Sequence, residues 1–553
     1  MRFSTAFDAI DKALSTKQIG SVVSVRVVAQ LADKPGEIEH VAAQLLDGAL
    51  TWLDDTAASV STIGEADRHL SLLLRSSKGF TALLSAGLCL TDSTTVEVVV
   101  FGTRGIMSWE GDSGLTSRVS NEAGMSLPAR DALALLKASV ANNSSTPGNN
   151  DFGQAASLLN TTLPTPAKLL PPYGLLLVAG DYTHQPGYAN ALLADGRCKL
   201  IGVADEDDVP DARRQLNQQL ADRLGVPMLS NLAEALQRDD VHAVSICAEP
   251  FRRGRIIVEA ARAGKHLYLD KPLAGSLEDA HAVVAAVVES GVVAHMFTQV
   301  NWDPAQRVKE ILESGEIGEL VAIHSDVCFA KGHGGRADLS KPRVESEVPT
   351  RFELPDAKRE FTNVGVYPVA MLLWLLRKNV RRVDAVTRNF FFAEHQANDM
   401  EDFGQMLMEF EGGVTATITA GRAGWRSHPG FGLHRVCVIG TKASVTVDAH
   451  RPRVEVWADV EPWSAPPRDP GDPMGMWAAL PDSPYNARPK ESWIMPREMA
   501  WADDAKHFLD CIEQGKQSQI SVDIAAVSTE ILLAAYRSAA TNQAVALPLA
   551  SSR

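Results

Sequence analysis

Residues 264–272, GKHLYLDKP, combine a short apolar strand with groups that could transfer a proton. The apolar core at 267–269 is followed directly by Asp270, Lys271 and Pro272. In open α/β sheets, ligands bind outside the carboxyl ends of the strands. An amine held there beside a carboxylate and a rigid proline could take a proton from a substrate hydroxyl. The alternative is a surface lysine without a chemical role, and the surrounding chain decides between the two.

The chain around Lys271 alternates between strand-like and helix-like segments. Apolar strand patterns such as LLLVAG, KLIGVAD and VVAHMFTQ are separated by helical patterns at about 210–224, 254–263 and 276–290. This alternation predicts a parallel, doubly wound sheet of the Rossmann type over residues 173–300.

The first strand-to-helix turn of such a sheet usually carries three glycines, which let backbone amides approach a pyrophosphate. In residues 179–187, AGDYTHQPG, only Gly180 holds one of the three glycine positions. Tyr182 could stack on a cofactor or block it, and Thr183 and His184 could supply side-chain donors instead. The motif is weak, and a turn that binds no phosphate stays open as the alternative.

Asp205 ends the second strand of this predicted domain. A carboxylate at that place can accept hydrogen bonds from both ribose hydroxyls of an adenosine. Residues 206–208 are also acidic, and their charge would repel a 2′-phosphate. The predicted cofactor is therefore NAD, with NADP less favoured.

Strand patterns of another kind flank the parallel domain, and 553 residues are too many for a single core. Residues 1–163 and 301–545 show alternating apolar and polar positions, which predict antiparallel sheets with covering helices. The Pro-rich stretch 164–172 predicts a linker. The predicted strands of the first segment lie at 22–30, 69–77, 80–88 and 94–102.

The two flanking segments contain matching stretches in the same order. KALSTKQIGSVVSVRVV (12–28) parallels EILESGEIGELVAIHSD (310–326), and VEVVVFGTRGIMSWEG (96–111) parallels HRVCVIGTKASVTVDA (434–449). Both stretches of the second pair have a predicted strand, a Gly-Thr step, a basic residue and another predicted strand. This order favours an internal duplication of the sheet domain.

Over residues 173–545 these features resemble the Gfo/Idh/MocA oxidoreductase family. The family's E-K-P signature appears as residues 270–272, and its approach to the nicotinamide, usually T-P-n, appears as Glu249-Pro250 followed by phenylalanine. Residues 314–319, SGEIGE, match a further short sequence motif of the family. The resemblance implies a Rossmann-like domain joined to an open-faced sheet domain, with Glu249, Pro250, Asp270 and Lys271 at the cofactor.

The family's second motif, D-x-G-x-H, falls in FTNVGVYPVAMLLWLL, where Asn363 and Tyr367 hold the acid and histidine positions. A tyrosine at the last position resembles the glucose–fructose oxidoreductase and dihydrodiol dehydrogenase branches. The resemblance implies Lys271 and Tyr367 as the catalytic pair, whereas Asn363 cannot titrate. The alternative for Tyr367 is a packing role. Arg359 and His395 join Asn363 as candidate substrate contacts.

The first segment then resembles a second C-terminal-type domain of this family. Val41, Ala43 and Leu45 stand at the positions that match its second motif, so this copy is expected to be non-catalytic. Family members pair through their open sheets, and an exposed apolar sheet face is a liability. We expect residues 1–163 to cover the sheet of 310–460 as a pseudo-dimer within one chain. Association of whole chains into a homo-oligomer is a second expectation.

The composition excludes several other classes. A net charge of −15 disfavours binding to nucleic acids or to an anionic membrane surface. No apolar run approaches the roughly 18 residues of a membrane span. The six cysteines form no CxxC pair, and no spacing typical of metal ligands occurs, so no metal site is predicted. Reduced, scattered cysteines and the absence of a secretion signal predict a cytoplasmic protein.

Together these features predict an NAD-dependent oxidoreductase that transfers hydride between nicotinamide and a sugar, a polyol or a sugar derivative. Two alternatives stay open. Transient oxidation could drive an elimination or a glycosidic cleavage in which NAD is recycled. The degraded glycine motif and Asn363 would also suit a nucleotide-sensing regulatory protein that performs no catalysis.

Overall fold

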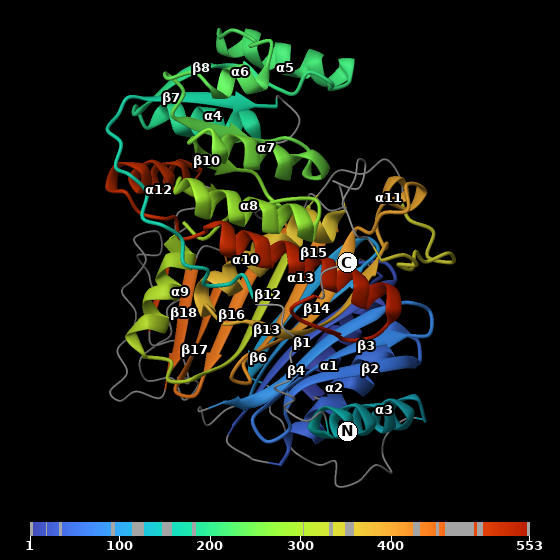
Figure 1. Cartoon of the computed structure of the whole chain (residues 1–553). Helices are drawn as coiled ribbons and strands as arrows, with labels where there is room; N and C mark the ends of the chain where they lie inside the picture. Colours follow the sequence, from blue (N-terminus) through green and yellow to red (C-terminus); the bar gives the residue numbers. More distant parts are fainter. Residues whose placement is uncertain are drawn as a thin grey trace, which may run out of the picture.

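The protein is described by a computed structural model, and Figure 1 shows the whole chain. A parallel sheet lies at the top of this view, the helices α10 (Glu360–Leu376) and α13 (Val522–Thr541) cross the middle, and two further sheets lie below. The described residues are 4–17, 19–32, 36–89, 94–112, 127–145, 157–179, 184–301, 303–330, 336–348, 359–423, 432–448, 453–458, 491–494 and 501–549.

The upper domain has the predicted Rossmann-like form. Its elements are β7 (Tyr173–Val178), α4 (Gln185–Ala194), β8 (Cys198–Ala204), α5 (Asp211–Leu224), α6 (Leu232–Leu236), β9 (Ala243–Ile246), α7 (Pro250–Arg262), β10 (His266–Leu269), α8 (Leu277–Ser290) and β11 (Ala294–Met296). All neighbouring strands are parallel, in the order β11-β10-β9-β7-β8. The strands β7, β9 and β10 are buried at every residue, which explains their continuous apolar sequences.

The second domain contains a mixed sheet in the order β19-β18-β17-β16-β12-β15-β14-β13-β20. Its strands are β12 (Leu320–Ala330), β13 (Val380–Arg388), β14 (Phe403–Phe410), β15 (Thr415–Ala423), β16 (Gly432–Gly440), β17 (Ala443–Asp448), β18 (Arg453–Ala458), β19 (Glu491–Ile494) and β20 (Val545–Ala546). Its other helices are α9 (Asp303–Ser314), α11 (Ala393–Ala397) and α12 (Trp501–Gln514). The predicted end at residue 545 falls inside β20, and the buried Leu547 and Leu549 extend the domain to residue 549.

The N-terminal segment forms its own sheet, with the order β2-β3-β4-β1-β5-β6. Its elements are α1 (Ser4–Ser15), β1 (Val22–Ala32), α2 (Ile38–Leu53), β2 (Ala57–Glu65), β3 (His69–Ser76), β4 (Thr81–Cys89), β5 (Thr95–Gly102), β6 (Gly105–Asp112) and α3 (Leu127–Ser145). All four predicted strands are present. Strand β2 was not predicted, because its half-buried residues lack a strict alternation.

The N-terminal sheet repeats the strand order of part of the second sheet. The order β2-β3-β4-β1-β5-β6 corresponds to β13-β14-β15-β12-β16-β17, strand for strand. In both sheets the first strand pairs in parallel with the fourth member of its set and antiparallel with the fifth. Both first strands also have a register shift near their start, at Val22/Ser24 and at Leu320/Ala322. We propose from this topology that the segments 1–163, 173–300 and 301–549 are the domains and that the first duplicates the third.

The N-terminal sheet packs face to face on the second sheet, as predicted for residues 1–163. A cluster of buried side chains from both sheets includes Val99 and Phe101 on one side and Phe390 and Phe403 on the other. The rings of Phe101 and Phe403 lie 5.2 Å apart in an edge-on arrangement. Smaller clusters join Leu73 to Leu407 and Val28 to Ile439. The apolar face that would otherwise be exposed is therefore covered within the chain.

Buried ion pairs also cross this interface. The Arg26 Nε donates to Asp326 Oδ1 at 3.2 Å, and both side chains are almost fully buried. Arg75 forms a second buried pair with Asp384. A buried charge is costly unless it is paired, so these pairs specify how the two sheets align.

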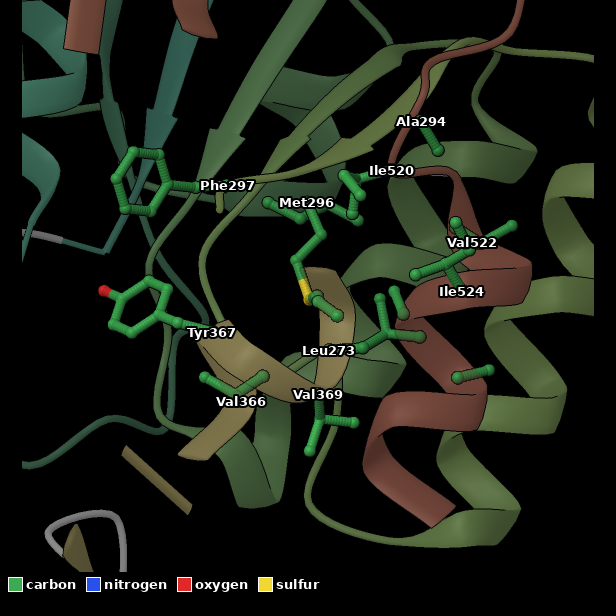
Figure 2. Close-up of a cluster of buried hydrophobic side chains, with 14 of the residues drawn as sticks. Leu273, Ala294, Met296, Phe297, Val366, Tyr367, Val369, Ile520, Val522 and Ile524 are labelled. Atoms are coloured by element: carbon green, nitrogen blue, oxygen red, sulfur yellow. The ribbon is translucent and has the colours of Figure 1, made fainter. Parts of the chain in front are cut away.

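Helix α13 connects the second sheet to the parallel domain, because it packs on both α8 and β13. Figure 2 shows apolar side chains gathered where the two domains meet. Met296, the last residue of β11, lies near Leu273 and Ile520, and Phe297 lies beside Tyr367 of α10. The Tyr367 hydroxyl points away from the aliphatic side chains. This packing fixes α10 relative to the end of β10.

None of the helices in the described part of the chain combines the length and the apolar character that a membrane span needs.

The paired charges between the two sheets lead to a stability prediction. Asp326→Ala leaves Arg26 buried without its carboxylate, and we expect the free energy of unfolding to fall by about 3–5 kcal/mol. Glu319→Ala is a matched control, because Glu319 forms a 3.9 Å pair with Arg68 in which both side chains are more than half exposed. We expect it to cost about 0–1 kcal/mol. Chemical denaturation measures both, and equal small losses would contradict the face-to-face packing.

Candidate active site

Asp270 and Lys271 follow directly after β10, where the parallel domain meets α10. The buried Asp270 carboxylate accepts hydrogen bonds from Tyr188 Oη at 2.8 Å and from Arg253 Nη2 at 3.3 Å, and it contacts His184 Nδ1 at 2.9 Å. Burial alone would raise the Asp270 pKa, but His184, Arg253 and Lys271 outweigh it and hold the pKa well below its usual value. Asp270 therefore stays ionised and anchors the turn.

Arg253 holds the backbone on both sides of Lys271. Its Nη1 donates to the carbonyl oxygen of Asp270 at 3.2 Å and to that of Pro272. Arg253 is buried, and its Nε donates to the Ala248 carbonyl at 2.8 Å. The lysine backbone is thus fixed by an arginine that the sequence analysis did not select.

The Lys271 amine contacts the second domain. Its Nζ donates to the carbonyl oxygen of Asn363 at 2.7 Å and to the side-chain Oδ1 of the same residue. It also lies 5.1 Å from the centre of the Tyr367 ring. The structure therefore brings Lys271, Asn363 and Tyr367 together, although these residues come from different domains.

The surroundings of Lys271 set its protonation. Burial lowers the Lys271 pKa, and the opposing effects of Asp270 and Glu360 and the further lowering by Arg422 leave it at about 8. Burial, followed by the charge of Asp270, raises the Tyr367 pKa well above its usual value. Near neutral pH the lysine can exchange a proton, whereas the tyrosine stays protonated.

A chain of hydrogen bonds continues from Asn363 into the second domain. Asn363 Nδ2 donates to Glu360 Oε2 at 3.3 Å. Glu360 also contacts His395 Nε2 at 3.1 Å and accepts from Arg422 Nε at 2.6 Å. His395, a candidate substrate contact, is thus linked to Lys271 through two intervening residues. Glu360, which lies three residues before Asn363 on one helix face, was not among the predicted site residues.

Arg359, a candidate substrate contact, lies in a cluster of buried charged residues. Its Nη2 donates to Glu345 at 2.8 Å, and its guanidinium lies over the Tyr536 ring at 4.6 Å. Glu401 is a further carboxylate nearby. These contacts assign Arg359 to a buried ion-pair cluster, and its role as a substrate contact stays a prediction.

The turn between β7 and α4 departs from a glycine-rich turn in a way that the structure explains. Gln185, at the third glycine position, is fully buried, and its Nε2 donates to the carbonyl oxygens of Val178, Ala179 and Ser245. The Gln185 side chain thus links α4 to the strands β7 and β9 by hydrogen bonds, at a position where a glycine would let the helix and strand backbones touch directly. Gly187 is required for a different reason: it makes room for the Trp501 side chain, because a Cβ at Gly187 would lie 1.7 Å from Trp501. The predicted residues Gly180, Tyr182 and Thr183 lie outside the described residues.

Asp205 lies at the end of β8 as predicted, but its hydrogen-bond capacity is filled by the protein. Its Oδ1 accepts from Arg252 Nη1 at 2.5 Å and from the Glu206 amide at 2.9 Å. Its Oδ2 accepts from Asn217 at 2.8 Å and from Arg252 Nη2 at 3.1 Å. A carboxylate has about four acceptor sites, so ribose hydroxyls can bind Asp205 only if Arg252 leaves.

Glu249 and Pro250, which were predicted to lie at the nicotinamide, also have structural roles. Pro250 begins α7, and Glu249 precedes it. The Glu249 carboxylate is bound by Arg252 and Arg213. Burial raises the Glu249 pKa, but Arg252 and Arg213 outweigh it, so its pKa is lowered overall. Glu249 therefore belongs to the network that holds Arg252 beside Asp205.

A cavity of about 410 Å³ adjoins this network. This volume lies within the range of about 300–1,000 Å³ that is typical of small-molecule sites. Arg252, which binds Asp205, lines this cavity, whereas Asp205 itself does not. The cavity is lined by Glu206, Asp208, Val209, Pro210, Ala212, Arg213, Leu216, Glu249, Phe251, Arg252 and Arg255.

A second cavity of about 30 Å³ lies beside Tyr367, between α10 and the second sheet. Gln299 and Ser325 line it, and both are buried. Within the described part of the chain, neither the Gln299 amide atoms nor the Ser325 hydroxyl has a hydrogen-bond partner. Each such atom costs about 1–3 kcal/mol when it is left unpaired. The cavity therefore suits a small polar group, and its volume exceeds the roughly 10–15 Å³ that one water needs.

Among the described residues, no group of three His, Cys, Asp or Glu side chains is arranged to hold a metal ion.

The parallel domain, the helix-covered sheet and the lysine between them define the class of Rossmann-fold oxidoreductases. Residues 179–298 match the oxidoreductase family with an NAD-binding Rossmann fold, and residues 305–446 match the GFO/IDH/MocA C-terminal domain. Over these two segments the chain matches the Gfo/Idh/MocA oxidoreductase family. Neither segment includes residues 1–163, so the proposed duplication rests on the sheet topology.

Relatives in Bacillus subtilis (strain 168) cover part of the chain. The uncharacterized oxidoreductase YrbE is 29% identical over 229 residues, which are 40% of this chain and 60% of that protein. The scyllo-inositol 2-dehydrogenase (NAD(+)) is 24% identical over 334 residues, which are 60% of this chain and 85% of the relative.

Solved structures confirm the fold. The levoglucosan dehydrogenase in complex with NADH and levoglucosan has a TM-score of 0.51 at 19% identity and covers 68% of this chain and 100% of its own. GenD2 from gentamicin A biosynthesis, in complex with NAD, has a TM-score of 0.50 at 23% identity and covers 70% of this chain and 100% of its own.

The saturation of Asp205 leads to a binding prediction. Arg252→Met frees two acceptor sites on Asp205, and we expect the dissociation constant for NAD to fall about tenfold, because ribose hydroxyls no longer compete with the guanidinium. Titration calorimetry measures this constant. Arg238→Met is the matched control with no expected change, since Arg238 does not line the cavity, is nearly half exposed and pairs with Asp240 rather than Asp205. Weaker binding by Arg252→Met would contradict the competition and show that Arg252 supports the nucleotide.

Proposed function

We propose that the protein is an NAD-dependent oxidoreductase that oxidises a hydroxyl group of a sugar, a polyol or a sugar derivative. The observation that carries this proposal is a buried lysine with a pKa of about 8, fixed at the end of a parallel strand and joined to a second domain. The family match and the inositol and levoglucosan dehydrogenases among its relatives support it.

NAD, when bound, supplies the acceptor for the hydride of the substrate carbon. Asp205 would hold the adenosine ribose after Arg252 withdraws, and the cavity next to Glu206 and Phe251 would enclose the base. On withdrawal, Arg252 keeps Glu249 and Glu206 as partners, which lowers the cost of its movement.

Lys271 acts as the general base in this proposal. Its neutral amine takes the proton from the substrate hydroxyl, and the resulting ammonium is stabilised by the carbonyl and side-chain oxygens of Asn363. Tyr367 stays protonated, so it donates a hydrogen bond rather than acting as the base. Its hydroxyl bonds to no other described residue, which leaves it available to a substrate oxygen.

The small cavity supports a substrate rich in hydroxyl groups. A hydroxyl both donates and accepts, as do the Gln299 amide and the Ser325 hydroxyl that lack partners in the described structure. Because Tyr367 lines the same cavity and lies next to Lys271, one hydroxyl could enter the cavity while another faces the amine.

One observation favours a second candidate function, a nucleotide-sensing protein that performs no catalysis. The protein's own Arg252, together with Asn217 and the Glu206 amide, occupies the acceptor sites of Asp205 that a ribose would use. A protein that binds its nucleotide only after such a rearrangement could report the nucleotide concentration by a change of conformation. The buried Lys271, with a pKa of about 8, favours the enzyme instead.

The proposed base predicts a pH profile. Oxidation should increase as pH rises through about 8, because the Lys271 amine must be neutral to accept the proton. Lys271→Ala should lower kcat by roughly 10²–10⁴-fold. Lys271→Arg should be similarly inactive across this range, since a guanidinium stays protonated.

A panel of polyols and sugars, including scyllo-inositol and levoglucosan, with NADH absorbance as the readout, tests this pH profile. Activity that is unchanged in Lys271→Ala would contradict the role of the lysine. Tight NAD binding without oxidation of any sugar would favour the nucleotide-sensing function.

The unpaired polar atoms predict a separate effect on substrate binding. Gln299→Leu removes the amide from the small cavity, and we expect KM for the sugar substrate to rise by about tenfold with a smaller change in kcat. The thermal midpoint should not fall, because two buried atoms without partners are lost. Ser325→Ala should act in the same direction with less effect. An unchanged KM in both variants would show that the cavity does not contact the substrate.

A further inference from the structure

We propose that Glu360 is a positioning residue for Lys271, which acts through Asn363 and supplies the negative charge that position 363 itself lacks. This inference rests on the proposed role of Lys271 as the catalytic amine. Glu360 lies in the first turn of α10 and touches neither the amine nor the cofactor cavity in any contact described above.

The two ends of the Asn363 amide face different partners. Its Oδ1 must face Lys271 to accept a hydrogen bond, because the amide Nδ2 would repel an ammonium. Glu360 Oε2 accepts from Nδ2 at 3.3 Å, so it binds the end of the amide that points away from the amine. Glu360 therefore selects the orientation in which asparagine can hold the lysine.

Glu360 is itself held in place from two further elements. His395 of α11 contacts Oε1 at 3.1 Å, and Arg422 of β15 donates to Oε2 at 2.6 Å. Glu360 is 2% exposed, so it has little room to rotate. Burial raises the Glu360 pKa, but the contacts with His395 and Arg422 outweigh it, so the carboxylate stays ionised near neutral pH.

The charges around Lys271 give this arrangement a measurable signature. Asp270 and Glu360 raise the Lys271 pKa, whereas Arg422 and Arg253 lower it, and the Tyr367 ring lies beside the ammonium. Removal of the Glu360 charge should therefore lower the Lys271 pKa, and removal of the Arg422 charge should raise it. A purely structural role for Glu360 would not produce opposite shifts in the two variants.

The test measures the Lys271 pKa without any substrate. The full-length protein is labelled with acetic anhydride over a range of pH, and mass spectrometry gives the labelled fraction of the peptide that contains Lys271. Glu360→Gln should move the labelling midpoint from about 8 to lower pH, and Arg422→Gln should move it to higher pH, by about 0.5–1 pH unit each. Arg422 is partly exposed, so its variant tests the proposal even if Glu360→Gln folds poorly.

A rescue experiment separates positioning from loss of structure. Asn363→Asp places a carboxylate directly against the amine, and we expect it to restore the midpoint when combined with Glu360→Gln. A midpoint that stays unchanged in Glu360→Gln, or that moves in the same direction in Arg422→Gln, would overturn the proposal. So would a failure of Asn363→Asp to restore it. If the midpoints shift as expected but no sugar is oxidised, the positioning role stands and the proposed function fails.

Discussion

The contact between the Lys271 amine and Asn363 is the constraint on which the account of this protein depends. Lys271 leaves the end of β10 in the parallel domain, whereas Asn363 belongs to α10, which packs on the second sheet. The amine can be held only if these two domains keep a fixed relation. The packing of Met296, Phe297 and Leu273 against residues of α10 and α13 provides that relation, as Figure 2 shows.

The N-terminal sheet supports the same contact by packing on the other face of the second sheet. It covers the face of the second sheet that α10 and α13 leave free, and buried pairs such as Arg26 with Asp326 align the two faces. Because its strand order repeats that of the second sheet, we propose that it takes the place of a second subunit within one chain. The sheet that supports α10 is then covered on its other face within the same chain.

Much of this fold could be predicted from sequence because its signals are local. The alternation around residues 173–300 and the short DKP motif required no knowledge of distant contacts. The sequence could not show that Gln185 replaces a glycine by bonding three carbonyl oxygens, or that Arg252 saturates Asp205, because both depend on side chains brought together by folding. Arg359 was predicted as a candidate substrate contact, and the sequence could not show its partners Glu345 and Glu401, because both are distant from it in sequence. Glu360 could have been found from its spacing to Asn363 on a predicted helix.

The central claim is that Lys271 faces the nicotinamide while Asp205 holds the adenosine ribose. A crystal structure of the protein soaked with NAD tests it most directly. We expect Arg252 to have left Asp205, both ribose hydroxyls to donate to that carboxylate, and the nicotinamide ring to lie against the Lys271 amine. A structure in which Arg252 keeps its bonds to Asp205 and the nucleotide is absent or bound elsewhere would contradict the account.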